Sequence, residues 1–126
     1  MFGKISNRGR PLSVHERLIY QDYFSQTVLN EARVIEDKVP CWLLKTMAGV
    51  VLRNCIYFRK NAYQPNTAVG VELLGHELTH VEQYLHGMNL WKYLWLSRNG
   101  YRKNPYEIKA YAKGAKIRAD FMRQSF

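Results

Sequence analysis

The sequence contains one segment whose residue types and spacing match a metal site, HELTH at residues 76–80. In a helix, residues four apart lie on the same face one turn apart, so the imidazoles of His76 and His80 can bind one Zn²⁺ ion. Glu77 is rotated by about 100° from His76, which places its carboxylate beside the ion rather than on it. This HExxH pattern is typical of zinc hydrolases, in which the glutamate is the general base that takes a proton from a zinc-activated water.

A zinc ion held by two histidines needs a third protein ligand, and His86 is one candidate. The string HELTHVEQYLH has the histidine spacing of the longer motif HExxHxxGxxH, but Gln83 stands where that motif has a helix-breaking glycine. If the helix continues, His86 lies about 15 Å along the axis from His76, too far to bind the same ion. A histidine that interacts favourably with the helix C-terminus is the simpler interpretation of His86.

Glu107 is the second and stronger candidate. It lies 27 residues after His80, in the first turn of another predicted helix, which could pack against the motif helix and direct the carboxylate at the ion. Beyond Glu82 the chain contains one other acidic residue, Asp120, which is more than three turns further along. The competing role of Glu107 is a capping box with Asn104. Two histidines and a glutamate leave the fourth zinc position open, as in catalytic sites.

The elements that position these residues are two predicted helices. Asn66 or Thr67 can cap a long helix that ends at His86, with Gly87 as the residue after the cap. Asn104 and the following proline mark the start of the last helix, which runs to about Arg123. Its apolar residues recur at helical spacing and predict a buried stripe, formed by Ile108, Ala112, Ala115, Ala119 and Met122.

The first half of the chain predicts a helix and strands. A capping box between Ser13 and Glu16 begins a helix that extends to Phe24. The β-branched residues of segment 28–39 favour a strand, and NCIYFRK at residues 54–60 is a better one. Segment 41–52 is apolar and fits either a helix or a buried strand.

Length and composition indicate one small basic domain. The chain has 126 residues, 47% of them hydrophobic, and a net charge of +9. We expect residues 1–10 to form a flexible basic arm and residues 11–126 to form a single domain. With no apolar signal segment and no stretch long enough to cross a membrane, a cytoplasmic location is expected. Cys41 and Cys55 lack metal-binding spacing and are expected to be reduced and buried.

The positive charge is concentrated in residues 88–126, which contain nine Lys and Arg but two Asp and Glu. Lys109, Lys113 and Lys116 share one face of the last helix, and Arg98, Arg102 and Lys103 precede them. Such a face could contact nucleic-acid phosphates, or it could be the solvated outer side of a helix whose inner side holds the metal. Residues 90–97 are unusually aromatic, and Trp91 and Trp95 could contact a protein partner or a membrane surface.

Four segments, RPLSVHERLIYQDYF, NCIYFRK, ELLGHELTHVEQY and YRKNPYEIKAYA, resemble a small bacterial zinc metallopeptidase domain found in the core of extracellular contractile injection systems. The resemblance spans Arg10 to Ala112. More loosely, the chain is similar to gluzincin peptidases, whose third ligand is the glutamate of a downstream ExxA helix. Glu107 and Ala110 stand at those positions, but Tyr111 replaces the aspartate that often supports a metal histidine.

The resemblance implies an α+β fold, a minimal zincin-like domain in which a small antiparallel sheet packs on the HExxH helix and on a C-terminal helix that carries a ligand. It also implies that NCIYFRK is an edge strand that binds an extended peptide by strand addition. Export by an injection route would follow from the same family.

Three functions fit these features. The first is a zinc metallopeptidase in which His76, His80 and Glu107 hold Zn²⁺ and Glu77 is the general base. Tyr101, Tyr111 and His86 are candidates for stabilising the oxyanion. The second is a non-catalytic zinc-containing binding or delivery module of a bacterial secretion or injection system, and the third is a nucleic-acid-associated protease similar to SprT.

Overall fold

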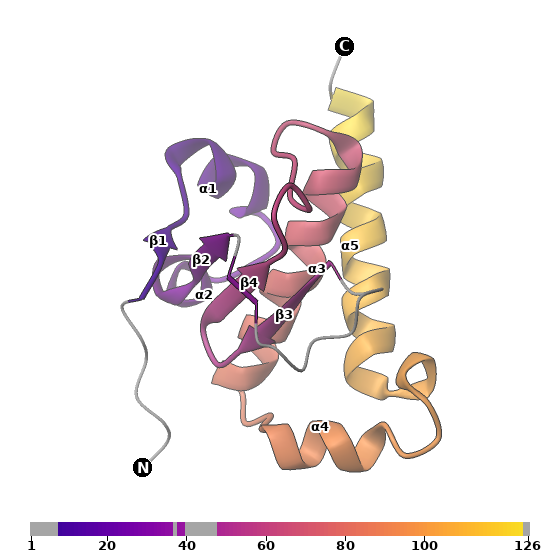
Figure 1. Cartoon of the computed structure of the whole chain (residues 1–126). Coiled ribbons are helices and arrows are strands. Elements are labelled where there is room, and N and C mark those ends of the chain that lie inside the picture. Colours follow the sequence, from indigo (N-terminus) through magenta and orange to yellow (C-terminus); the bar gives the residue numbers. More distant parts are fainter. Residues whose placement is uncertain (1–7, 37, 40–47, 125–126) are drawn as a thin grey trace.

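A computed structural model describes residues 8–36, 38–39 and 48–124 and shows an α+β fold, as expected (Figure 1). The four strands are β1 (Arg10–Pro11), β2 (Arg33–Glu36), β3 (Gly49–Leu52) and β4 (Cys55–Phe58). The helices are α1 (Val14–Tyr20), α2 (Gln26–Glu31), α3 (Ala68–Leu85), α4 (Leu90–Leu96) and α5 (Pro105–Gln124), with a short 3₁₀ turn, η1, at Tyr101–Lys103. The expected arm, residues 1–10, lies mostly outside the described residues, as does Cys41.

The sheet is mixed, so the prediction of an antiparallel sheet is wrong. Its strand order is β1-β2-β4-β3, and β2 runs parallel to β4 with Val34 opposite Ile56, whereas the two outer pairs are antiparallel. β3 and β4 form a hairpin that turns at Arg53 and Asn54. Through this hairpin β4 pairs with β2 and runs in the same direction, although β3 lies between them in the sequence. β4 therefore lies inside the sheet and β3 at its edge, which also corrects the prediction that NCIYFRK is the edge strand.

The N-terminal helices begin at side-chain caps. Ser13 and Glu16 form the expected capping box, but α1 ends at Tyr20 rather than Phe24. The chain then enters a turn in which the backbone N–H groups of Tyr23 and Phe24 both donate to the carbonyl of Tyr20. Segment 26–31 is a helix rather than the start of a strand, since the Ser25 side chain caps its first turn. The β-branched pattern becomes a strand only from Arg33 onward.

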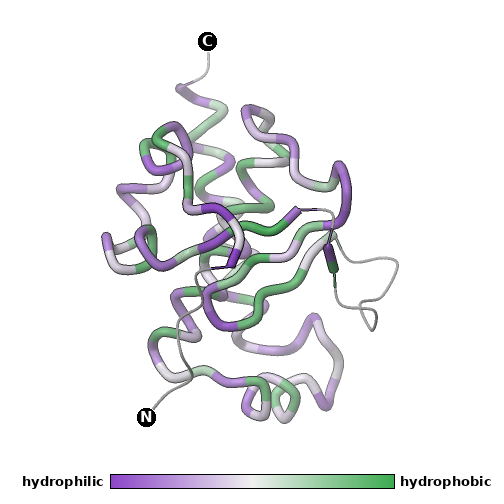
Figure 2. Tube along the Cα trace, turned by 60° about the vertical axis from the view of Figure 1, so that its left-hand side comes forward, coloured by the Kyte–Doolittle hydropathy of each residue, from purple (hydrophilic) through white to green (hydrophobic). Residues whose placement is uncertain are grey.

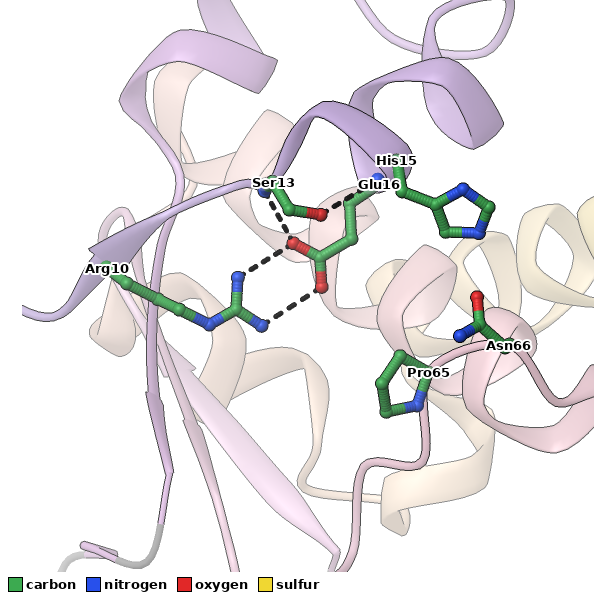
Figure 3. A pocket seen from close by; sticks show the side chains of 6 residues that line it. All are labelled: Arg10, Ser13, His15, Glu16, Pro65 and Asn66. Atoms are coloured by element: carbon green, nitrogen blue, oxygen red, sulfur yellow. Dashed lines mark hydrogen bonds and ion pairs between the residues drawn. The ribbon is translucent and has the colours of Figure 1, made fainter.

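Glu16 also joins the first strand to the core. Its carboxylate accepts two hydrogen bonds from the Arg10 guanidinium (2.8 and 3.0 Å) and one from the Tyr63 hydroxyl (2.7 Å). Arg10 and Glu16 line a small pocket of about 390 Å³ (Figure 3). The other residues that line it are Ser13, His15, Pro65 and Asn66. Burial alone would raise the pKa of Glu16, but these hydrogen bonds lower it to about 2.

The long helix α3 packs against β3 and β4 and also along α5, which runs antiparallel to it (Figure 1). The Thr67 side chain caps its N-terminus, and after Leu85 the chain leaves the helix through Gly87, whose positive φ of 107° suits glycine. The predicted α3 is thus confirmed to within one residue.

The buried face of α5 is not the predicted apolar stripe, whose five residues are all exposed. The buried residues are instead Glu107, Ala110, Gly114 and Ile117. Small residues allow the two helices to approach closely: a Cβ atom on Gly114 would lie 3.0 Å from the carbonyl oxygen of Glu72 in α3. A pattern of hydrophobic residues cannot reveal a face made of a carboxylate and a glycine.

Hydrophobic residues concentrate along the central strands, and hydrophilic ones at the turns between elements (Figure 2). Large side chains from most elements meet in one core between the sheet, α1, α2 and α3, including Tyr20, Leu29, Ile56, Phe58, Leu74 and Leu78. Cys55 is buried there as a free thiol, as predicted. None of the described helices is long and apolar enough to cross a membrane.

Candidate metal centre

Three side chains converge where α3 and α5 pack together. His76 and His80 project from successive turns of α3, and Glu107 projects from the first turn of α5. Glu107 lies 3.0 Å from His76 through Oε1 and 3.2 Å from His80 through Oε2, and the two imidazole Nε2 atoms are 3.2 Å apart. The structure thus brings together the three residues predicted to bind zinc, all of them buried.

The spacing of these atoms fits a small cation. Zn²⁺ bonds to nitrogen and oxygen of about 2.0 to 2.2 Å imply ligand atoms roughly 3.3 Å apart in a tetrahedral site. The observed separations of 3.0 and 3.2 Å are close to this value. Glu107 Oε1 is also buried without a hydrogen bond, although His76 Nε2 lies near it. A buried carboxylate oxygen without a donor is costly, and a bound cation would remove that cost.

Gln83 orients the His80 ring so that its Nε2 atom can bind a cation. Its amide nitrogen donates to the carbonyl of Tyr106 (3.0 Å), so its Oε1 faces His80 Nδ1 at 2.8 Å. Since an amide oxygen can only accept, Nδ1 carries a proton, and in the neutral ring Nε2 presents a lone pair to Glu107 and His76. This is the tautomer that a metal bound at Nε2 requires.

Protons compete with a metal at this centre. Burial would lower the pKa of His80, but its contact with Glu107 and the charge of Glu77 outweigh burial and raise it. Burial would raise the pKa of Glu107, but the imidazoles of His76 and His80 hold it well below its usual range. A bound metal would compete with protons for these side chains, so metal binding should weaken as the pH falls.

Glu77 lies beside the three residues rather than among them. Its Oε1 is 3.9 Å from His76 Nε2, and it is buried beneath the edge strand. Gly49 of β3 lies close above it: a Cβ atom there would lie 3.2 Å from Glu77 Oε2, and closer still, 2.5 Å, to the Tyr57 carbonyl oxygen. Burial raises the pKa of Glu77, and the imidazoles of His80 and His76 oppose this shift only in part. This is the position expected of a general base next to a metal.

Helix α4 contacts the centre through one side chain, Tyr93. Its hydroxyl donates to Glu107 Oε2, and burial together with this hydrogen bond raises the pKa of Tyr93, so the hydroxyl stays protonated. Asn104 fixes the same region, because its amide donates to the carbonyl of Tyr93 and to the Ser97 hydroxyl while its Oδ1 accepts from the Tyr106 N–H. Asn104 thus caps α5, and the Glu107 carboxylate faces the histidines instead of closing a capping box.

The remaining candidates occupy different places. The Tyr111 ring packs edge-on against His76, with ring centroids 4.5 Å apart, and its hydroxyl is 2.9 Å from that of Tyr101. His86 is the exposed C-cap residue of α3 and is not among the clustered ligands, so its role as third ligand is not supported. Asp120 is bound to Arg123 and Tyr23, away from the centre.

The centre opens into a cleft of about 780 Å³ between β3 on one side and α4 on the other, with α3 as its floor. His76, Glu77, His80 and Glu107 all line it, as do Tyr93, Tyr101 and Tyr111. Beyond these residues the wall is largely apolar, formed by Val50, Val51, Leu52, Val69, Leu73, Tyr84, Met88, Leu90 and Leu94. The arrangement could hold a metal at the base of a largely apolar cleft.

Acidic residues neutralise part of the predicted cationic face of α5. Lys113 of α5 pairs with Glu82 of α3 (3.1 Å), and Lys116 pairs with Asp120 one turn further along α5 (3.5 Å). Two of the three lysines are therefore engaged within the protein, which favours the interpretation of this face as a solvated outer surface. Contact with nucleic acid stays an untested prediction.

Two residues of the centre, Gln83 and Tyr93, are not predicted from the sequence. Gln83 lies three residues after His80, a helical spacing at which side chains meet, and this signal could have identified it. No comparable signal marks Tyr93, because its contact depends on how α4 folds back onto α5.

A buried His-His-Glu cluster on two packed helices defines this chain as a candidate mononuclear metal protein. Residues 23–88, more than half of the chain, match the family model of the eCIS core domain, and the chain belongs to this family of extracellular contractile injection system domains. The match includes α3 with both histidines but ends before α4 and Glu107. No curated protein and no solved structure matches the chain.

Proposed function

We propose that the protein is a zinc-dependent metallopeptidase associated with a bacterial contractile injection system. The observation that supports this most directly is the cluster of His76, His80 and Glu107 at the base of the cleft, with Glu77 3.9 Å from His76. Membership of the eCIS core family supports the association and a route of export through such a system.

The roles of the side chains follow from their positions. When bound, zinc supplies Lewis acidity, which polarises a peptide carbonyl and lowers the pKa of water. Glu77, with its raised pKa, accepts a proton from the attacking water and later delivers it to the leaving nitrogen. The hydroxyls of Tyr101 and Tyr111 face the cleft and can donate to the carbonyl oxygen as negative charge develops there. The edge strand β3 can pair with an extended substrate.

Two measurements test the proposal: elemental analysis of the purified protein, and cleavage of a broad peptide library. We expect one zinc per chain, retained in Glu77→Gln and lost in Glu107→Ala, with cleavage abolished in both variants. His86→Gln is the matched control, because it changes a histidine of the same helix outside the cluster and should keep both metal and activity. Normal cleavage by Glu77→Gln would refute the assigned mechanism.

The exposed aromatic helix α4 favours one alternative, a zinc-containing binding or delivery module without catalysis. All four of its large outward-facing apolar side chains are exposed, which is unusual for a domain that acts alone. The same experiment separates the two functions. Bound zinc without turnover on any library member would favour the binding module.

A further inference from the structure

Helix α4 presents an apolar face that nothing in the described part of the chain covers. Leu90, Trp91, Leu94 and Trp95 form this α4 face, and they are between 47% and 79% exposed. None of the seven residues of α4 is buried. Exposed tryptophan on this scale indicates a binding surface rather than a poorly packed core.

The four side chains form one continuous surface. Their positions i, i+1, i+4 and i+5 span about 140° around the helix axis. Tyr93, whose hydroxyl donates to Glu107, lies about 130° from the centre of this face and attaches the helix to the His-His-Glu cluster. The helix is thus attached through its inner side, and its outer side remains open.

The charged side chains within α4 and in the segment that follows it are all cationic. Lys92, Arg98, Arg102 and Lys103 lie within or just after α4, and the sequence contains no acidic residue between Glu82 and Glu107. The Arg98 guanidinium lies over the Trp95 ring, 4.3 Å from its centroid, so at least one cation borders the apolar surface directly.

We propose that the α4 face binds the surface of a bilayer that contains anionic lipid. A helix with tryptophan and leucine on one face and cations at its border lies in the membrane interface, where the rings enter the headgroup region and the cations meet lipid phosphates. The leucines distinguish this surface from a nucleic-acid platform, since bases stack on aromatic rings and gain little from an aliphatic side chain. A helix of seven residues that lies parallel to the bilayer surface can bind there without crossing the membrane.

The α4 face and the cleft have two residues in common, and these determine how the protein would lie on a membrane. Leu90 and Leu94 belong to the α4 face and also line the cleft above the metal centre. Membrane binding through this face therefore places the opening of the cleft next to the lipid surface. This interaction does not depend on catalysis and stands whether or not the centre hydrolyses peptides.

The test is co-sedimentation of the full chain with vesicles of equimolar phosphatidylcholine and phosphatidylglycerol, and with vesicles of phosphatidylcholine alone. We expect binding to the anionic vesicles that weakens at high salt. The Trp91→Ser, Trp95→Ser double variant should bind at least about tenfold more weakly, because each ring buries a large apolar area. Leu18→Ser is the matched control, since Leu18 of α1 is 59% exposed and lies outside the α4 face.

A second pair of variants tests the charge. Neutralising Arg102 and Lys103 to glutamine should weaken binding by about fivefold for each residue. Lys60→Gln removes an exposed lysine before the opposite end of α3 and should leave binding unchanged. Zinc content and circular dichroism report whether each variant folds, and quenching of tryptophan fluorescence by brominated lipid tests the wild-type protein without any substitution.

Several results would overturn the proposal. They are failure of the wild-type chain to bind anionic vesicles, equal binding by the double tryptophan variant, and absence of quenching by brominated lipid in the bound protein. Binding to a thymidine oligonucleotide in place of vesicles would assign the surface to nucleic acid. Capture of a protein partner through the α4 face without vesicle binding would assign it to a protein interface.

Discussion

Replacing Gln83 tests whether a residue outside the metal ligands controls the centre. Gln83→Met keeps the length and packing of the side chain but removes both of its hydrogen bonds, the acceptor at 2.8 Å from His80 Nδ1 and the donor at 3.0 Å from the Tyr106 carbonyl. His80 then loses the partner that selects its Nδ1–H tautomer. Partners of metal histidines typically contribute 10- to 100-fold in metal affinity, so we expect a loss of roughly this size.

The effect on stability can be separated from the effect on metal. Two buried hydrogen bonds of about 1 kcal/mol each predict that the unfolding free energy of the metal-free Gln83→Met variant falls by about 2 kcal/mol. Gln83→Glu retains an acceptor for His80 but places a second acceptor against the Tyr106 carbonyl. We therefore expect Gln83→Glu to keep near wild-type metal affinity while losing stability.

Zinc affinity is measured by competition with a chromophoric chelator, and stability by urea unfolding of the metal-free protein. Gln64→Met is the matched control, because Gln64 also donates to a backbone carbonyl but on the exposed surface before α3. If Gln83→Met bound zinc as tightly as the wild type, or if Gln83→Glu lost as much zinc affinity as Gln83→Met, the inferred tautomer would be wrong.

Two further predictions concern the framework. Gly114→Ala places a methyl group 3.0 Å from the Glu72 carbonyl and should force α3 and α5 apart. We expect it to lower the unfolding free energy by about 1 to 3 kcal/mol and to weaken zinc binding. The control Ala115→Ser, at an exposed neighbouring position, should change neither quantity. Glu16 has a folded-state pKa of about 2 against 4.5 when unfolded, so it stabilises the protein above about pH 4.5 and this contribution is lost as the pH falls toward 2. Glu16→Gln should therefore lower the unfolding free energy at neutral pH by about 2 to 3 kcal/mol, a value already reduced because Arg10 is partly exposed to solvent. It should also flatten the acid-unfolding curve below about pH 4.5.

Each framework prediction has a contrary outcome. Unchanged zinc affinity in Gly114→Ala would mean that Glu107 adjusts independently of the helix separation. An acid-unfolding curve of Glu16→Gln that parallels the wild type between pH 4.5 and 2 would mean that other carboxylates dominate acid sensitivity.

The sequence predicts the two long helices, α3 and α5, and the two clustered histidines because their signals are local. Thr67 and Gly87 bound α3, Asn104 starts α5, and the spacing of His76 and His80 requires only that the segment is helical. Glu107 could be identified because so few acidic residues follow the motif. The helix bounds and the histidine pair depend on residues within a few turns of one another, whereas Glu107 is identified by the scarcity of other acidic residues.

What the sequence does not predict depends on contacts between distant segments. The parallel pairing of β2 with β4 joins strands about 20 residues apart, and no local pattern distinguishes it from an antiparallel pair. The apolar pattern mispredicts the buried face of α5, because Glu107 and Gly114 rank as polar or neutral, although the His-His-Glu cluster and the close helix contact place them inside. Hydrophobic periodicity fails where function, rather than burial of apolar area, decides which face turns inward.

The location of the candidate ligands on two helices would give a bound metal a mechanical role as well as a chemical one. An ion held by His80 and Glu107 would tie together two points 27 residues apart in the chain, much as a disulfide does. Closing a loop of that length removes unfolded-state entropy worth about 3.5 kcal/mol. In a chain whose described cysteine, Cys55, is free, the ion would act as a cross-link. Loss of metal would then loosen α5 and the α4 segment together, so a variant such as Glu107→Ala changes the mechanical integrity of the domain as well as its chemistry.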